Sequence, residues 1–261
     1  MFGMSATAYD LKFSLLGIPV RVHPSFWLVA ALLGWNDQNL ALVALWIVCM
    51  LVSIVVHEFG HGLTAQRFHG SPSILLYAMG GLCQSEGQRS KPQRLAVVLA
   101  GPAAGFLLLV VSLLTTTVFL GVTPGEHVAL ITAGFGFRAD QLQIFSALRK
   151  FGGQYPLNLY FFMVQINLLW TLFNLLPIWP LDGGQATQIV LDMADPRNGA
   201  RRAHILSLVT AGVLAVMVGS WSQNLFLTLF LAYFAFVNFQ ILQAMHHARS
   251  LGARDDDWWR R

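Results

Sequence analysis

The sequence contains few charged residues. Charged side chains account for 11% of its 261 residues, while hydrophobic residues account for 56%. Soluble domains carry about 25% charged residues, so this composition is typical of a protein that lies largely within a membrane. Glutamate is especially scarce, and Glu58, Glu86 and Glu126 are its three positions. A glutamate inside an apolar stretch is therefore a candidate for chemistry, because a charge at membrane depth is costly without a partner or a function.

Cysteine is scarce as well. Cys49 and Cys83 are the two cysteines of the chain, which excludes a disulfide framework and a cysteine-based zinc finger. The formal net charge of +4 comes mostly from arginines near the ends of apolar stretches. Basic residues in such positions indicate contact with lipid headgroups. We therefore expect a lipid bilayer around the chain and no nucleic-acid partner.

Six apolar stretches follow one another along the chain. A helix needs roughly 17–25 apolar residues to cross a bilayer, and five of the six stretches are that long, whereas the first is short. We predict an all-α integral membrane protein with about six transmembrane helices. The stretches are 24–35, 40–66, 95–122, 157–181, 205–221 and 224–245.

The basic residues predict the orientation of these helices. With both termini in the cytoplasm, thirteen of the sixteen Lys and Arg residues fall on the inner side, and Arg138, Arg149 and Lys150 fall on the outer side. This asymmetry is the one that the positive-inside rule requires. We expect a multi-pass protein of the bacterial inner membrane, with a cytoplasmic N-terminal segment (1–23), a transmembrane core (24–248) and a cytoplasmic C-terminal tail (249–261).

The segment between the second and third predicted spans, 68–93, is not helical in character. Residues 73–79 are rich in strand formers, and Gly80 and Gly81 follow them. This pattern predicts a small β-hairpin near the inner membrane surface. The hairpin is either a plain connector or an edge strand that pairs with an unwound substrate and so exposes its peptide bond.

A candidate metal site lies at the inner end of the second span. Residues 40–56 contain a single polar side chain, Ser53, and His57, Glu58 and His61 follow directly. On a helix, two histidines four residues apart lie on one face and can share one metal ion. Glu58 points to a neighbouring part of that surface, where it can act on a water molecule instead of ligating. The spacing indicates a zinc hydrolase.

A third ligand is expected on another segment at similar depth, because catalytic zinc commonly takes three protein ligands and leaves one position open. Asp182 at the inner end of the fourth span is the favoured candidate. Pro177 and Pro180 should break that helix, and Gly183 and Gly184 should let the backbone turn sharply. Four other candidate ligands lie in more polar segments: His69, Glu86, Asp192 and Asp195.

Together these motifs resemble those of the site-2 protease family of intramembrane zinc metalloproteases. His57-Glu58-x-x-His61 matches the metal and base motif of the family, and the segment 174–184 matches its second motif, whose aspartate is Asp182 here. The stretches 17–25 and 101–105 are also similar. This chain departs from the family pattern at Trp179, where a proline is frequent, and at Gly105, where an asparagine is frequent.

The resemblance implies a role for each motif residue. Zn²⁺ is the implied cofactor, with His57, His61 and Asp182 as its ligands. Glu58 would take a proton from the attacking water and pass it to the leaving amine. The amide of Asn174 would donate a hydrogen bond to the developing oxyanion, although a buried asparagine can also join two helices.

The implied activity is hydrolysis of peptide bonds in a membrane-spanning protein substrate near the cytoplasmic face. The implied biological setting is regulated intramembrane proteolysis, with a regulatory membrane partner. Two other functions fit the same residues. One is a different membrane metallopeptidase that trims lipidated proteins or signal-peptide remnants, and the other is a non-hydrolytic transporter or metal sensor with a structural ion.

Overall fold

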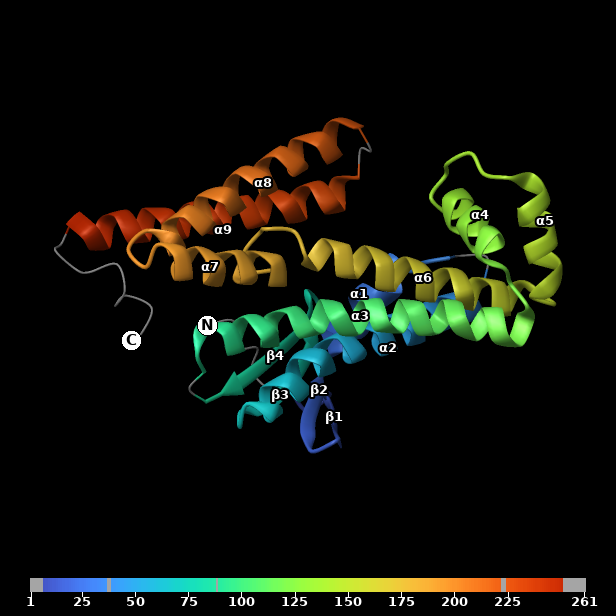
Figure 1. The fold of residues 1–261 in the computed structure, drawn as a ribbon, viewed down its shortest axis with the longest axis horizontal. Coiled ribbons are helices and arrows are strands. Elements are labelled where there is room, and N and C mark those ends of the chain that lie inside the picture. The colour runs from blue at the N-terminus through green and yellow to red at the C-terminus, as the bar shows by residue number, and fades with distance from the viewer. Residues whose placement is uncertain (1–6, 37–38, 88, 222–223, 251–261) are drawn as a thin grey trace. The chain divides into compact units, whose positions relative to one another are not determined.

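The computed structural model describes residues 7–36, 39–87, 89–221 and 224–250. The chain divides into two compact units, which are described separately. The first unit comprises residues 1–88 and 100–171, and the second comprises residues 89–99 and 172–261. Most of the described chain is helical, as Figure 1 shows, and a small sheet accompanies the helices.

Five helices are long and apolar enough to cross a membrane. Their lengths of 21 to 30 residues exceed the roughly 20 residues that a bilayer requires. The described residues thus provide five such helices, against the six spans predicted. The five are α2 (Leu40–Arg67), α3 (Lys91–Leu120), α6 (Gln154–Asn174), α8 (Gly199–Trp221) and α9 (Leu225–Ser250).

The first predicted span is a short helix, α1 (Pro24–Leu33). Its ten residues give a length of about 15 Å, half the thickness of a bilayer core. The helix begins after His23, whose side chain accepts a hydrogen bond from the Ser25 amide, and it ends at Gly34. A Cβ at Gly34 would overlap the indole of Trp46 on α2. The close approach of Trp46 therefore requires glycine where α1 ends.

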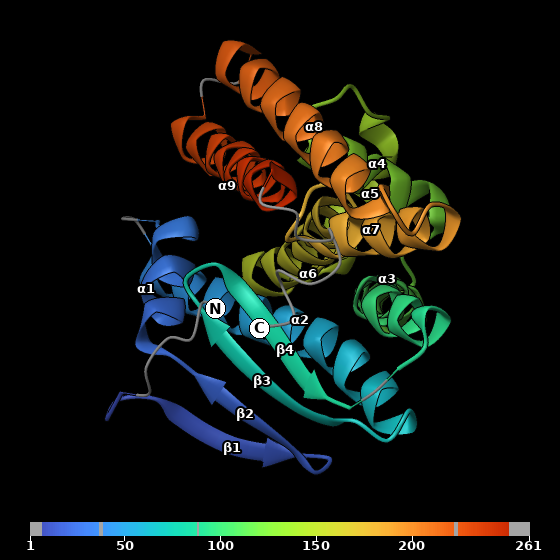
Figure 2. The same cartoon turned by 90° about the vertical axis from the view of Figure 1, so that its left-hand side faces the viewer.

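The first unit contains a four-stranded sheet, seen clearly in Figure 2, with the order β1-β2-β3-β4. Strands β3 and β4 form an antiparallel hairpin between α2 and α3. Strand β2 pairs in parallel with β3, and β1 pairs antiparallel with β2. The bounds of the strands are Leu11–Leu15 for β1, Ile18–Val22 for β2, Ser71–Tyr77 for β3 and Gly80–Glu86 for β4.

One face of this sheet packs on α2. Alternate residues of β2 and β3 are buried, among them Val20, Val22, Ile74 and Leu76, and they join Ile54 of α2 in one hydrophobic cluster. Alternation along a strand places these side chains on one face, because successive side chains point to opposite sides. The sheet thus rests directly on the helix that carries the histidine motif.

Two short helices connect α3 to α6 in the first unit: α4 (Pro124–Gly134) and α5 (Gln141–Lys150). The buried carboxylate of Glu126 joins them, since Lys150 donates to it at 2.6 Å and Ser146 donates as well. Burial alone would raise the pKa of Glu126, but the hydrogen bonds from Lys150, Ser146 and Thr123 outweigh burial and lower that pKa to about 2. The carboxylate is therefore ionised under ordinary conditions.

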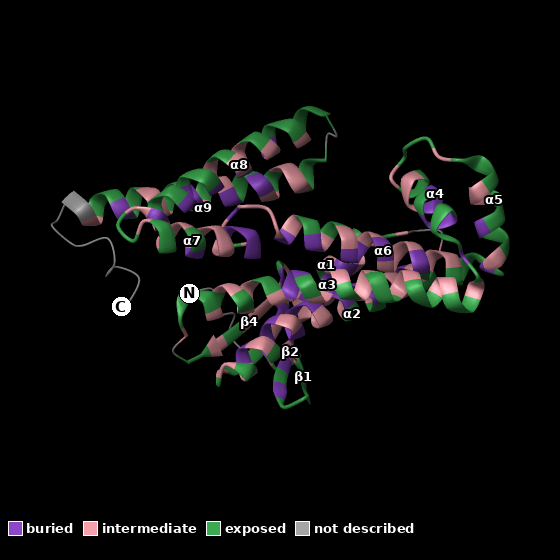
Figure 3. Cartoon of the chain, viewed as in Figure 1, coloured by how far each residue is buried: buried purple, intermediate pink, exposed green. Residues whose placement is uncertain are grey.

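The second unit is built from α7 (Asp182–Ala194), α8 and α9. Ile178, Ala211, Leu231 and Phe234 form the centre of its hydrophobic cluster. Figure 3 shows much of the surface of α8 and α9 as exposed, and large apolar side chains such as Val216 lie on it. Exposed apolar surface of this extent is typical of helices that face lipid.

Candidate metal centre

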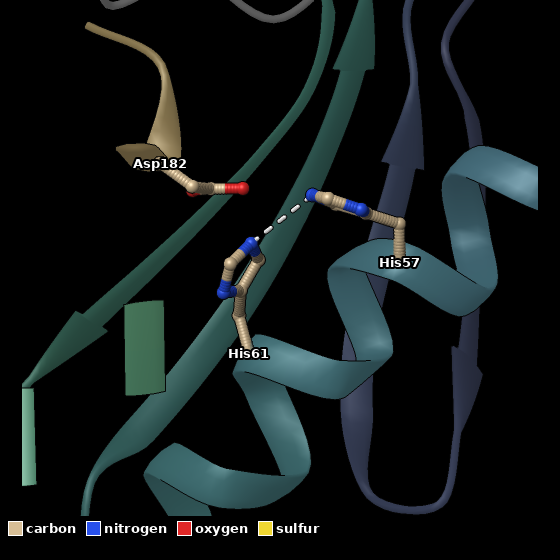
Figure 4. A group of neighbouring side chains, drawn as sticks. All are labelled: His57, His61 and Asp182. Carbon is tan, nitrogen blue, oxygen red and sulfur yellow. Dashed lines mark hydrogen bonds between the residues drawn. The ribbon is translucent and has the colours of Figure 1, made fainter. Parts of the chain in front are cut away.

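The two histidines of the motif face each other on α2. Their Nε2 atoms lie 3.3 Å apart (Figure 4), and both side chains are buried. Two nitrogen ligands at about 2.0–2.1 Å from a tetrahedral Zn²⁺ are themselves roughly 3.3–3.4 Å apart. The separation of the two Nε2 atoms of His57 and His61 therefore fits a shared zinc ion.

Glu58 occupies the position next to this pair, against the sheet. Its side chain is buried, and a Cβ at Gly81 of β4 would overlap its carboxyl group. Glycine at position 81 therefore allows the strand to pass directly beside the carboxylate. The contact places Glu58 at the β4 side of α2.

Helix α3 approaches the other side of the motif through small residues. A Cβ at Gly101 would overlap the imidazole of His61, and a Cβ at Gly60 of α2 would overlap the carbonyl of Ala100. The Gly101-x-x-x-Gly105 stretch thus lets α3 lie against α2, as small residues commonly do between membrane helices. The specific consequence here is a pocket for the His61 ring, which the sequence pattern does not reveal.

In the second unit, Asp182 is the first residue of α7 and is buried. Helix α6 ends at Asn174, and the segment 175–181, which contains Pro177 and Pro180, separates the two helices. Gly183 and Gly184 lie so close to the backbone of residues 175–179 that a Cβ at either position would overlap it. This is the sharp turn that the glycines predict. It holds the Asp182 carboxylate at a helix N-terminus, a favourable place for a negative charge.

Polar residues of α8 and α9 hold the irregular segment before Asp182. The backbone amide of Trp179 donates to Ser207 Oγ at 3.0 Å, and Asn238 donates to the carbonyl of Trp179 at 2.8 Å. His204 pairs with Asn238 at 2.8 Å. Backbone groups outside a helix need such partners within a bilayer. Ser207, His204 and Asn238 are thus residues that position the Asp182 segment, and sequence inspection did not single them out.

Asn174 is the last residue of α6 and is also buried. Asn167, two turns earlier, donates to Ser53 of α2 at 3.0 Å and so joins two helices. Among the other candidate ligands, Asp195 ends α7 and accepts hydrogen bonds from the amides of Arg197 and Asn198. These contacts give Asp195 a structural role at a helix end.

Comparison with known proteins shows the family. The model of Peptidase family M50 matches residues 45–219, and the chain belongs to that family. Stage IV sporulation protein FB of Bacillus subtilis is 28% identical over 78% of this chain and 57% of its own length. Zinc metalloprotease MJ0392 of Methanocaldococcus jannaschii is 26% identical over 70% of this chain and 46% of its own length.

A solved structure shares the fold. The site-2 protease from Methanocaldococcus jannaschii aligns with a TM-score of 0.52 and 22% identity, over 90% of this chain and 95% of that one. Family membership and the shared fold confirm the resemblance drawn from the two motifs. With its five apolar helices, this family member is an integral membrane protein. The chain spans about half the length of the two relatives named above.

Proposed function

We propose that this protein is an intramembrane zinc metalloprotease that hydrolyses peptide bonds of membrane-spanning proteins near the cytoplasmic face. The observation that carries the proposal is the pair of buried imidazoles on α2, whose Nε2 atoms are 3.3 Å apart, with the buried carboxylate of Glu58 beside them. Membership in Peptidase family M50 supports the same reading.

Asp182 is the proposed third ligand. His57 and His61 of the first unit and Asp182 of the second would together hold one metal ion, and Figure 4 draws these three buried side chains. Two imidazoles and one carboxylate are a common ligand set of catalytic zinc sites, which leave a fourth position open. When bound there, Zn²⁺ supplies a Lewis acid that polarises the scissile carbonyl and makes water a stronger acid.

Glu58 and Asn174 would perform the remaining chemistry. The Glu58 carboxylate takes a proton from the attacking water and then delivers it to the nitrogen of the leaving amine. The Asn174 side-chain amide donates a hydrogen bond to the oxygen that becomes negative during attack, and groups of this kind contribute about 3–4 kcal/mol in other hydrolases.

The sheet provides a place for the substrate backbone. Strand β4 is at one edge of the sheet, and its Gly81 lies against Glu58. An unwound substrate segment that added to this edge would present its carbonyl groups beside the proposed base. This arrangement supports the proposal that the hairpin binds substrate and is more than a plain connector.

We also propose how the elements of the chain are arranged in the membrane. Helix α1 would be a sixth, membrane-embedded element that does not cross the bilayer alone, with the β3–β4 hairpin near the inner surface. The positive-inside rule places both termini in the cytoplasm, which makes 1–23 a cytoplasmic segment and suits the bacterial inner membrane. The tail 249–261 lies almost entirely outside the described residues. A regulatory membrane partner would control access of the substrate.

The test compares wild-type protein with Glu58→Gln in detergent or liposomes, with a helical membrane protein as substrate. We expect Glu58→Gln to retain zinc and to lose cleavage by at least about 10²-fold, the effect of removing a general base. A transporter or a metal sensor would tolerate this substitution. Cleavage by Glu58→Gln at the wild-type rate would refute the protease assignment. Trimming of signal-peptide remnants in preference to intact spans would instead favour the other metallopeptidase function.

A further inference from the structure

Thr171 on α6 carries a hydroxyl group that makes no hydrogen bond to the backbone of its own helix. The residue is fully buried, and its Oγ1 has no hydrogen-bond partner among the described residues. Threonine and serine in membrane helices usually donate to the carbonyl four residues earlier. On α3, Ser112 and Thr115 do so, at 2.8 and 2.7 Å. Thr171 does not follow this hydrogen-bonding pattern, although leaving a buried hydroxyl unpaired is unfavourable.

The hydroxyl lies beside the first histidine of the metal motif. A Cβ at Gly105 of α3 would overlap Thr171 Oγ1 and would lie 3.8 Å from His57 Nδ1. The Thr171 hydroxyl therefore occupies the place that a side chain at residue 105 would fill, and the His57 imidazole lies at the edge of that place. All three residues belong to the first unit.

This location matters because of the two ring nitrogens of His57. Nε2 faces His61 and would bind the metal, so Nδ1 must carry the proton. Metal-binding histidines almost always donate that second N–H to an acceptor, which fixes the tautomer and the ring orientation. A threonine hydroxyl is a good acceptor and can rotate its own hydrogen away.

We propose that Thr171 is a positioning residue for the metal centre. When the metal is bound, its Oγ1 would accept a hydrogen bond from Nδ1–H of His57, either directly or through one water, and so direct the Nε2 lone pair toward the metal. The proposal rests on the proposed function, since it requires that His57 is a metal ligand. It also explains the glycine, because a larger residue at position 105 would displace the hydroxyl.

The test measures zinc affinity of the purified full chain in detergent by competition with a chelating dye. Thr171→Val removes the hydroxyl at nearly constant volume, and we expect it to weaken zinc binding about 10–100-fold. Thr171→Ser keeps the hydroxyl and should bind zinc nearly as wild type does. Thr116→Val is the matched control, because Thr116 donates to carbonyls of its own helix. It should leave the affinity unchanged.

Thermal unfolding of the metal-free proteins separates positioning from packing. Thr171→Val keeps the side-chain volume, and without metal the proton of His57 can sit on Nε2, which faces His61. We therefore expect no lower unfolding temperature for metal-free Thr171→Val, so weaker zinc binding would not reflect a damaged fold. Zinc affinity of Thr171→Val equal to that of wild type overturns the proposal. A loss in Thr171→Val that accompanies an equal loss in Thr171→Ser overturns it too.

A second pair of variants tests the space itself. The Cβ position of residue 105 is 3.6 Å from Thr171 Cβ, an ordinary contact, so Gly105→Asn should fit once the hydroxyl is removed. We expect Thr171→Ala to weaken zinc binding and the double variant Gly105→Asn/Thr171→Ala to restore it, with the asparagine carbonyl as acceptor. If wild-type zinc binding survives His57→Ala, the proposed function fails as well, whereas zinc binding that requires His57 but not Thr171 refutes the Thr171 proposal alone.

Discussion

The side-chain amide of Asn238 on α9 donates a hydrogen bond of 2.8 Å to the backbone carbonyl of Trp179. Trp179 lies three residues before Asp182, in the irregular segment between α6 and α7. The side-chain oxygen of the fully buried Asn238 also accepts a hydrogen bond from Nδ1 of His204. A residue of α9 thus determines where the backbone runs just before the proposed third ligand.

This contact leads to the first prediction. Asn238→Leu leaves a backbone carbonyl unpaired within the helices, at a cost of about 1–3 kcal/mol. We expect a lower unfolding temperature together with weaker zinc binding, because the segment before Asp182 loses its anchor. The control is Asn158→Leu, since the Asn158 amide donates to the carbonyl of Gln154 in its own helix. Equal zinc affinity in the two variants would contradict the positioning role of Asn238.

A second prediction concerns Gly101. Gly101→Ala places a methyl group where the His61 ring lies, so the ring must leave its position. We expect loss of zinc binding and of cleavage, measured by metal analysis and by peptide-bond hydrolysis. Gly212→Ala on α8 is the control, because a Cβ there meets no atom within 4 Å. Alanine exceeds glycine in helix propensity by about 1 kcal/mol, so the control should be as stable as wild type or more so.

The third prediction is a pH dependence of the α4–α5 region. The pKa of Glu126 in the folded protein is lowered to about 2, below the value of about 4.3 for an unperturbed glutamate. A lowered pKa stabilises the fold above the unfolded value, and this stabilisation disappears as the pH falls from about 4.3 toward 2. The amides of α4 and α5 should therefore lose protection against hydrogen exchange over this range, measured relative to the intrinsic exchange rate at each pH. In Glu126→Gln this protection should vary much less with pH. A variant whose protection changes with pH as it does in wild type would contradict the role of the carboxylate.

Local patterns account for the features that sequence predicts well. The apolar run of α2 and the four-residue spacing of His57 and His61 are properties of one helix. Both can therefore be predicted from the sequence of that helix alone. The break at Pro177 and Pro180 is likewise local, and helix α6 ends at Asn174 just before it. The family match, residues 45–219, includes both of these segments.

Features that depend on contacts between distant segments could not be predicted in this way. Strands β1 and β2 are short, and β2 gains its place by pairing with β3, more than fifty residues later. Helix α1 is shorter than the apolar stretch 24–35 suggests, because Gly34 ends it against Trp46. The environment of Thr171 depends on Gly105 of another helix, and the sequence pattern of neither helix predicts this contact.

The most direct test of the account is X-ray absorption spectroscopy at the zinc edge on the purified protein, compared with Asp182→Ala. We predict a first shell of nitrogen and oxygen at about 2.0–2.1 Å, with the multiple-scattering signature of two imidazoles. In Asp182→Ala the two imidazoles should remain and the carboxylate oxygen should be lost from the first shell. A sulfur ligand, a spectrum without imidazole scattering, or an identical spectrum for Asp182→Ala would contradict the proposed ligand set of His57, His61 and Asp182.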